Sequence, residues 1–90
     1  MSGATSDLSP ALTPAQCRAG RALVGLRQGE LAALAKVSRK TLTDFENGER
    51  QPYPRTIRDI REALEEKGVI FLQADDDGGL GVRFRNTHGS

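Results

Sequence analysis

Apolar residues recur every three or four positions between residues 27 and 48, which is the period of an α-helix. The apolar positions of this stretch are Leu31, Ala32, Ala35, Val37, Leu42 and Phe45. Their spacing predicts two short helices, at 28–35 and 38–46, each with one buried face. Lys36 and Val37 form the tight turn between them, and the pair Asn47-Gly48 is typical of a helix end.

Two longer helices are predicted on either side of this pair. Thr13 has the features of a helix cap, Pro14 suits the first helical position, and Gln16 completes a capping box. The first helix is expected to run to about residue 24 and the last from residue 54 to 67, each ending at a glycine. The sequence therefore predicts a mainly α fold with four helices in residues 13–68.

The C-terminal part has the pattern of a β-hairpin at residues 69–85. Four consecutive apolar residues precede an acidic turn at 75–79, and apolar and polar residues then alternate. A strand that is apolar on both faces needs cover on both, and the helices can supply only one. We therefore interpret the hairpin as a dimerisation element. Its interface candidates are Val69, Ile70, Phe71, Leu72, Leu80, Val82 and Phe84.

A second arrangement stays open at this point. The hairpin could fold back on its own last helix, and a dimer could then form through that helix and the loop before it. Residues 1–12 contain few apolar side chains and are expected to be a flexible arm, and residues 86–90 are expected to be a disordered tail.

Composition narrows the function classes. Ninety residues suit one small domain, and the single Cys17 cannot form an internal disulfide, which fits a reducing cytoplasm. Cys17 is most simply a small core residue, with a redox role as the weaker alternative. No apolar run approaches the roughly 20 residues of a membrane span. The sequence offers no nucleophile–base pair, metal-ligand set or phosphate loop, so we expect neither an enzyme nor a cofactor.

The charge distribution indicates a nucleic-acid partner although the net charge is only +1. Residues 18–61 contain ten Lys or Arg and five Asp or Glu, a balance of +5, whereas residues 62–90 contain three and six, a balance of −3. The positive charge thus accompanies the two short helices, where a surface facing phosphates is expected.

The pair of short helices is the pattern of a helix-turn-helix, whose second helix enters the DNA major groove. Its exposed residues, our candidates for contacts with base edges, are Ser38, Arg39, Lys40, Thr43 and Asp44. An Arg fork matches the two acceptors of guanine. Asp44 could accept from a cytosine amine or only repel phosphate and so sharpen the register.

The sequence resembles the lambda-repressor/Cro-like (XRE-type) helix-turn-helix family of prokaryotic and phage regulators from about residue 13 to 68. The residues that carry the resemblance are Arg21, Gln28, Leu31, Ala32, Val37, Ser38, Thr41, Leu42, Glu46, Gly48 and Pro52. The resemblance implies a four-helix DNA-binding domain in which Arg21 pairs with Glu46 as a structural lock. It also implies contacts with the DNA backbone, for which the candidates are Arg27, Gln28, Asn47, Arg50 and Tyr53. Tyr53 could equally pack on its loop.

Three residues depart from the family pattern. Arg27 occupies the usual Ser or Thr cap position, Gly29 lies in the first turn of its helix, and Lys36 replaces the usual glycine of the turn. A lost cap and an interior glycine each cost about 1 kcal/mol. These changes put the turn geometry in question rather than the motif.

The function that follows is binding of double-stranded DNA by a transcriptional regulator, interpreted as a homodimeric repressor that covers a promoter at an inverted repeat. One alternative is an antitoxin that binds its own promoter and a toxin partner. A protein-interaction module that has lost DNA binding is a third reading, which the basic charge disfavours. The expected location is the cytoplasm, on the nucleoid.

Overall fold

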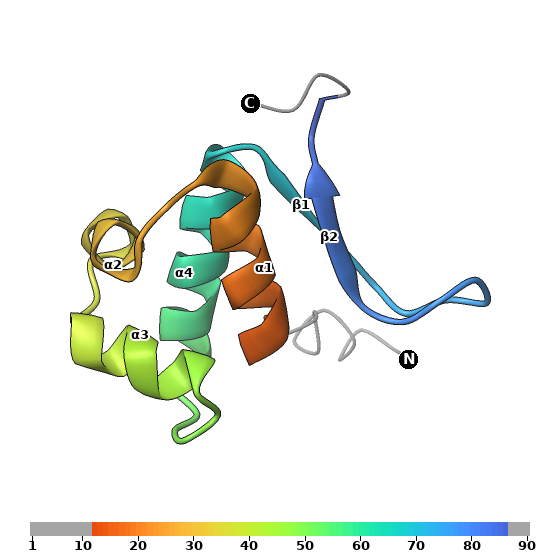
Figure 1. The fold of residues 1–90 in the computed structure, drawn as a ribbon. Helices are drawn as coiled ribbons and strands as arrows, with labels where there is room; N and C mark the ends of the chain where they lie inside the picture. Colours follow the sequence, from red (N-terminus) through yellow and green to blue (C-terminus); the bar gives the residue numbers. More distant parts are fainter. Residues whose placement is uncertain (1–11, 87–90) are drawn as a thin grey trace.

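Four helices followed by a two-stranded hairpin make up the structure, a computed structural model that describes residues 12–86 (Figure 1). The elements are α1 (Pro14–Val24), α2 (Gln28–Ala35), α3 (Arg39–Glu46), α4 (Pro54–Glu66), β1 (Val69–Leu72) and β2 (Gly81–Phe84). The prediction of a mainly helical fold with a C-terminal hairpin is confirmed. Residues 1–11 of the expected arm and 87–90 of the expected tail lie outside the described residues.

The start of α1 is built as a capping box. The Thr13 hydroxyl accepts the Gln16 N–H at 3.1 Å, and Gln16 Oε1 accepts the Thr13 N–H at the same distance. Leu12, the last residue of the expected arm, is only 2% exposed and belongs to the core. Leu12 therefore belongs to the folded domain rather than to the arm, since its apolar side chain packs in the core.

The hydrophobic core lies where the four helices and the inner side of the hairpin meet. Its apolar members are Leu12, Cys17, Leu31, Ala32, Ala35, Leu42, Phe45, Ile57, Ile60, Ala63, Leu64, Val69 and Phe71. Two polar side chains are buried with them, Gln16 and Glu46. Buried polar groups need hydrogen-bond partners, so these two residues show where the fold is specified by directional contacts.

The turn between α2 and α3 keeps its geometry without a glycine. Lys36 adopts the left-handed conformation with φ 61°, and its N–H and that of Val37 bond back to the last turn of α2. A side chain in this conformation costs roughly 1 kcal/mol relative to glycine. At the other end of α2 the Arg27 side chain forms no cap, and Glu30 instead accepts the Arg27 N–H at 2.8 Å.

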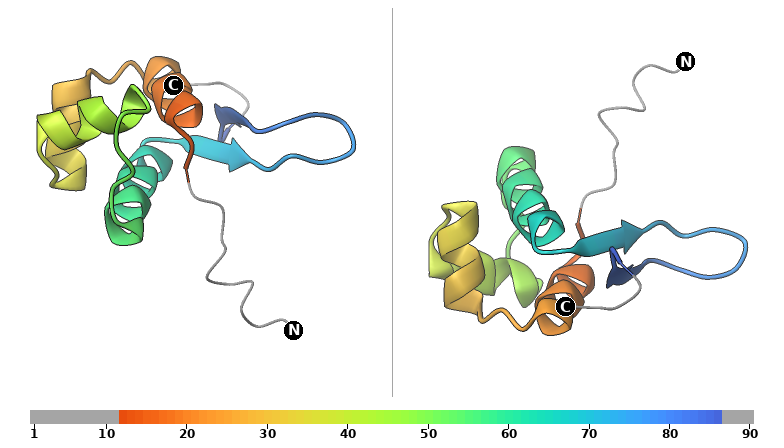
Figure 2. Two further views of the ribbon diagram at one scale, coloured as in Figure 1. Left: turned by 90° about the horizontal axis from the view of Figure 1, so that it is seen from below. Right: turned by 90° about the horizontal axis from the view of Figure 1, so that it is seen from above.

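The hairpin folds back on the helices of its own chain. β1 and β2 pair antiparallel, with Val69 opposite Phe84 and Phe71 opposite Val82. Val69 and Phe71 are buried, and Val82 packs against the core, so these side chains form the inner face. The guanidinium of Arg61 lies 5.4 Å from the centre of the Phe71 ring. The inner face thus covers α1 and α4 (Figures 1 and 2).

The seven interface candidates of the hairpin do not share one surface. Val69 and Phe71 are 1% and 7% exposed and serve the core of their own chain, because alternate residues of a strand point to opposite faces. Ile70 and Leu72 point the other way and are half-buried, and Leu80 lies before β2 and is 48% exposed. Val82 and Phe84 lie opposite Phe71 and Val69 on the inner face, so Ile70, Leu72 and Leu80 are the candidates that remain for a partner.

Gln16 fastens the hairpin to α1. Its Nε2 donates to the carbonyl of Leu72 at 3.3 Å and to that of Gly81 at 3.2 Å. One side chain therefore caps α1 and holds the ends of both strands. Among residues 12–86, no helix combines the length and the apolar character that crossing a bilayer would require.

Candidate nucleic-acid interface

The start of α3 presents two exposed cations to solvent. Ser38 caps the helix: its hydroxyl accepts the Thr41 N–H at 3.0 Å and donates to Thr41 Oγ1 at 2.8 Å. Arg39 and Lys40 follow on the first turn, and both are exposed. The hydroxyl of Ser38 is thus used within the helix, whereas the guanidinium of Arg39 takes part in none of the ion pairs found among residues 12–86.

Lys40 and Asp44 form an ion pair one turn apart on α3. Their charged atoms lie 3.3 Å apart, with the Lys40 side chain 82% exposed and that of Asp44 18% exposed. An exposed pair of this kind stabilises the helix little. Its consequence is local, because Lys40 compensates the negative charge of Asp44 on a surface that would meet phosphates.

Glu46, at the end of α3, is the centre of a buried polar cluster. Arg21 of α1 donates to both carboxylate oxygens at 2.8 Å, a bidentate ion pair. Gln28 of α2 donates to Oε1 at 2.9 Å, and the Cys17 thiol of α1 donates to Oε2 at 3.0 Å. Glu46 is 1% exposed, so four donors from two helices replace its hydration.

The cluster shifts the pKa values of its members. Burial alone would raise the pKa of Glu46, but the hydrogen bonds from Arg21, Gln28 and Cys17 outweigh it and hold that pKa below its ordinary value. The hydrogen bond to Glu46 raises the pKa of Arg21. Burial, followed by the bond to Glu46, raises the pKa of the Cys17 thiol well above its usual range. Cys17 is therefore a neutral donor and a poor nucleophile.

Gln28 joins α2 to α3 through both ends of its amide. Its Nε2 donates to Glu46, and its Oε1 accepts the Thr43 hydroxyl at 3.1 Å. An amide nitrogen has two hydrogens, so one donor of Gln28 remains for a ligand. The Thr43 hydroxyl donates its hydrogen to Gln28, so the lone pairs of its oxygen remain as acceptors.

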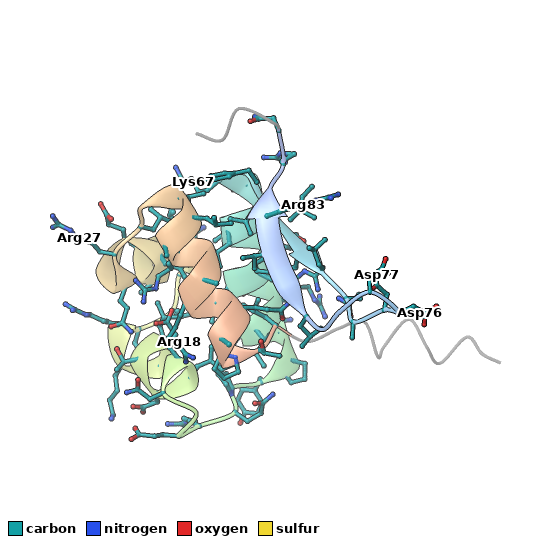
Figure 3. All side chains as sticks on the ribbon, turned by 45° about the vertical axis from the view of Figure 1, so that its right-hand side comes forward. Arg18, Arg27, Lys67, Asp76, Asp77 and Arg83 are labelled. Carbon is teal, nitrogen blue, oxygen red and sulfur yellow. The ribbon has the colours of Figure 1, made fainter. Side chains whose placement is uncertain are left out.

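The remaining backbone-contact candidates lie at the ends of these helices. Arg27 is exposed at the start of α2 and points away from the bundle (Figure 3). Asn47 caps the C-terminus of α3, and Arg50 lies in the following loop; both are exposed. Tyr53 is 82% exposed, so it does not pack on its loop.

Arg18 is a contact that sequence reasoning missed. It lies between α1 and α3 (Figure 3), where its Nη1 donates to the backbone carbonyl of Glu46. A cation at this end of α3 satisfies a free carbonyl and complements the helix dipole. The sequence holds no signal for it, because the contact depends on how α1 crosses α3.

A comparison with protein families shows to which family the chain belongs. The helix-turn-helix family model matches residues 18–69, more than half of the chain. The chain belongs to the lambda-repressor-like (XRE-type) helix-turn-helix family. No curated protein matches it. Family membership makes this chain a DNA-binding regulator in general terms, and the matched region contains α2 and α3 in full.

Proposed function

We propose that this helix-turn-helix protein is a sequence-specific repressor that covers a promoter as a homodimer in the cytoplasm. The observation that carries the proposal is the first turn of α3. There Arg39 and Lys40 are exposed to solvent while the other end of the same helix is fixed by the Glu46 cluster. A rigidly held helix with exposed cations at its N-terminal end suits insertion into the major groove.

The proposed base contacts differ in their chemistry. Arg39 reads guanine through a bidentate fork, and Lys40 adds a second donor. Thr43 serves as an acceptor, because its hydroxyl hydrogen is already donated to Gln28. Asp44 accepts from a cytosine amine only if its pair with Lys40 opens. Ser38 contributes through its place at the helix start rather than through its hydroxyl.

The proposed backbone contacts position the domain. Arg27, Arg50 and the free amide hydrogen of Gln28 face phosphates, and Asn47 and Tyr53 add hydrogen bonds from the loop. Such contacts carry affinity without sequence preference and make it dependent on salt. In a dimer, two α3 helices about 34 Å apart would read an inverted repeat.

The experiment that tests this function selects bound sites from random double-stranded DNA and then compares variants on the selected site. Arg39→Ala and Lys40→Ala should each weaken binding and relax preference at one base pair, since a good base contact is worth about 1–3 kcal/mol. Arg50→Ala should weaken binding to all DNA sequences alike. It should also lower the slope of log affinity against log salt concentration by about one.

Arg58→Ala is the matched control, because it removes an equal charge from an exposed position on α4. It should leave base preference unchanged. If neither Arg39→Ala nor Lys40→Ala alters which site is preferred, α3 is not the reading element. If wild-type protein selects no sequence at all, the proposed function fails.

A further inference from the structure

The hairpin has an outward face that its own helices do not cover. Since Val69, Phe71 and Val82 point inward, the alternate positions Ile70, Leu72 and Arg83 point away from α1 and α4. The Arg85 N–H donates to the Gly68 carbonyl at 2.7 Å, which extends the same register and places Arg85 on the outward face too. This face therefore carries the half-buried Ile70 and Leu72 together with two exposed cations at its base, one of which, Arg83, lies opposite Ile70.

The opposite charge is found at the tip of the hairpin. Asp75 serves the turn itself: its carboxylate accepts the N–H groups of Asp77 at 2.8 Å and Gly78 at 3.1 Å. Asp76 and Asp77 are exposed and point away from the chain, at the far end of the hairpin from Arg83 (Figure 3). None of the ion pairs found within residues 12–86 includes Asp76, Asp77, Arg83 or Arg85.

A single hairpin cannot bring its two charged ends together. Arg83 lies opposite Ile70, six residues from Asp76 along the strand direction, or about 20 Å. The tip also projects past the helices, so no other element of the described chain covers it (Figure 2). The acidic tip and the basic base can meet only between two molecules.

We propose that the outward faces of two copies stack antiparallel, so that the Asp76-Asp77 tip of each copy lies over Arg83 and Arg85 of the other. Arg83 lies level with Ile70, so the midpoint between Arg83 and Asp76 along the hairpin is at residue 73, one residue beyond Leu72. The two-fold axis therefore passes beside Leu72, and this side chain packs against Leu72 of the other copy. The same patch serves both molecules, which is the requirement for a closed dimer.

This arrangement rests on the homodimer of the proposed function and gives it a defined contact. It leaves α3 open, because the hairpin and α3 lie on opposite sides of the bundle (Figure 1). The stack also explains why the tip and the base of the hairpin carry opposite charges that form no ion pair within residues 12–86. A face that took an unrelated protein would have no need for charges that complement each other across a two-fold axis.

The test uses charge reversal in the full-length chain without DNA, followed by sedimentation. The tip variant Asp76→Lys/Asp77→Lys and the base variant Arg83→Glu/Arg85→Glu should each raise the dimer dissociation constant at least about tenfold, because like charges then face each other. An equimolar mixture of the two should form a heterodimer, since both tip-to-base contacts are again opposite in sign. A chain with all four changes should regain the homodimer.

Glu62→Lys/Glu66→Lys is the matched control, with the same change of charge at exposed positions of α4, and it should dimerise like the wild type. Melting curves show that each variant is folded. A monomeric wild-type chain overturns the proposal, and so does a mixture that stays monomeric although the single variants are weakened. Binding of each variant to a single half-site is measured separately, because it reports the helix-turn-helix function whether or not the dimer forms.

Discussion

Glu46 is the residue on which the placement of α3 depends. Its Oε1 accepts from Arg21 and Gln28, and its Oε2 accepts from Arg21 and Cys17. These donors come from α1 and α2, so a single carboxylate connects three helices. Because Glu46 is the last residue of α3, the cluster holds the helix at the end opposite to Arg39.

Removing either member of the central ion pair should destabilise the fold. Arg21→Ala leaves a buried carboxylate without its counter-charge, which costs about 3 kcal/mol, the low end of the range for buried pairs because Arg21 is 20% exposed. Glu46→Ala should cost a similar amount. Urea unfolding of both single variants and of the double variant should show a double loss smaller than the sum. Strictly additive losses would mean that the two side chains act independently.

The lowered pKa of Glu46 predicts how stability depends on pH. A carboxylate whose pKa is lower in the folded state binds fewer protons there than in the unfolded chain. Its stabilising contribution is complete above the unfolded pKa of about 4.3 and is lost as pH falls through the folded value. The difference in unfolding free energy between wild type and Glu46→Gln should therefore be constant from pH 6 to 8 and shrink below about pH 4. A difference that grows on acidification would contradict this assignment.

At the scale of elements, the local sequence signals are strong enough to predict the helices. Thr13, Pro14 and Gln16 fix the start of α1, and the apolar period fixes α2 and α3 to within one residue of the expected bounds. The helices α3 and α4 are each one residue shorter than predicted, because Ser38 and Lys67 are caps rather than helical residues. These signals lie within a few residues of each other and need no tertiary contact.

What could not be predicted depends on distant contacts. The sequence predicts the part of Gln16 in the capping box, but its bonds to Leu72 and Gly81 require the hairpin to cross the start of α1. Likewise, the strand pattern predicts alternation without saying which face of β1 meets the helices. The positions of Arg39, Lys40 and Arg50 on the candidate interface follow from the motif, whereas the bonds of Gln28 to Thr43 and Glu46 do not.

Lys36 makes the turn between α2 and α3 a site of stored strain. Lys36→Gly should stabilise the domain by about 1 kcal/mol, because glycine adopts φ 61° without a clash between Cβ and the backbone. Lys36→Ala is the control, since it removes the same charge and keeps the Cβ. Urea unfolding should place the glycine variant above both the wild type and the alanine variant. Equal stability of glycine and alanine would show that the turn is unstrained.

Gln16→Glu should destabilise the hairpin although glutamate is a good capping-box residue. The carboxylate can still accept the Thr13 N–H, but it replaces an amide donor that bonds two carbonyls. The unpaired buried groups should cost about 1–3 kcal/mol. Hydrogen exchange should show early loss of protection in β1 and β2 while α2 and α3 stay protected. Unchanged exchange in the strands would mean that Gln16 serves α1 alone.

At the scale of the whole molecule, the hairpin belongs to the folding unit rather than being attached to it. Gly20 of α1 lies so close to the strand that a Cβ there would be 3.5 Å from the Phe71 ring. Val69 and Phe71 fill the gap between α1 and α4. The four helices of the family pattern therefore do not form a complete core in this chain.

Truncation after Gly68 should consequently unfold the domain instead of only separating a dimer. Loss of the buried Val69 and Phe71 side chains removes roughly 3–6 kcal/mol, at about 1.5–3 kcal/mol for each, from a domain whose total stability is expected to be about 5–15 kcal/mol. The truncated chain should lose its cooperative melting transition by circular dichroism. The tip variant Asp76→Lys/Asp77→Lys alters the same hairpin without touching the core, so it should keep a cooperative melting transition. A truncated chain that melts within a few degrees of the wild type would show that the helices suffice. Otherwise, loss of DNA binding on truncation reports unfolding, and only changes on the outward face can separate dimerisation from stability.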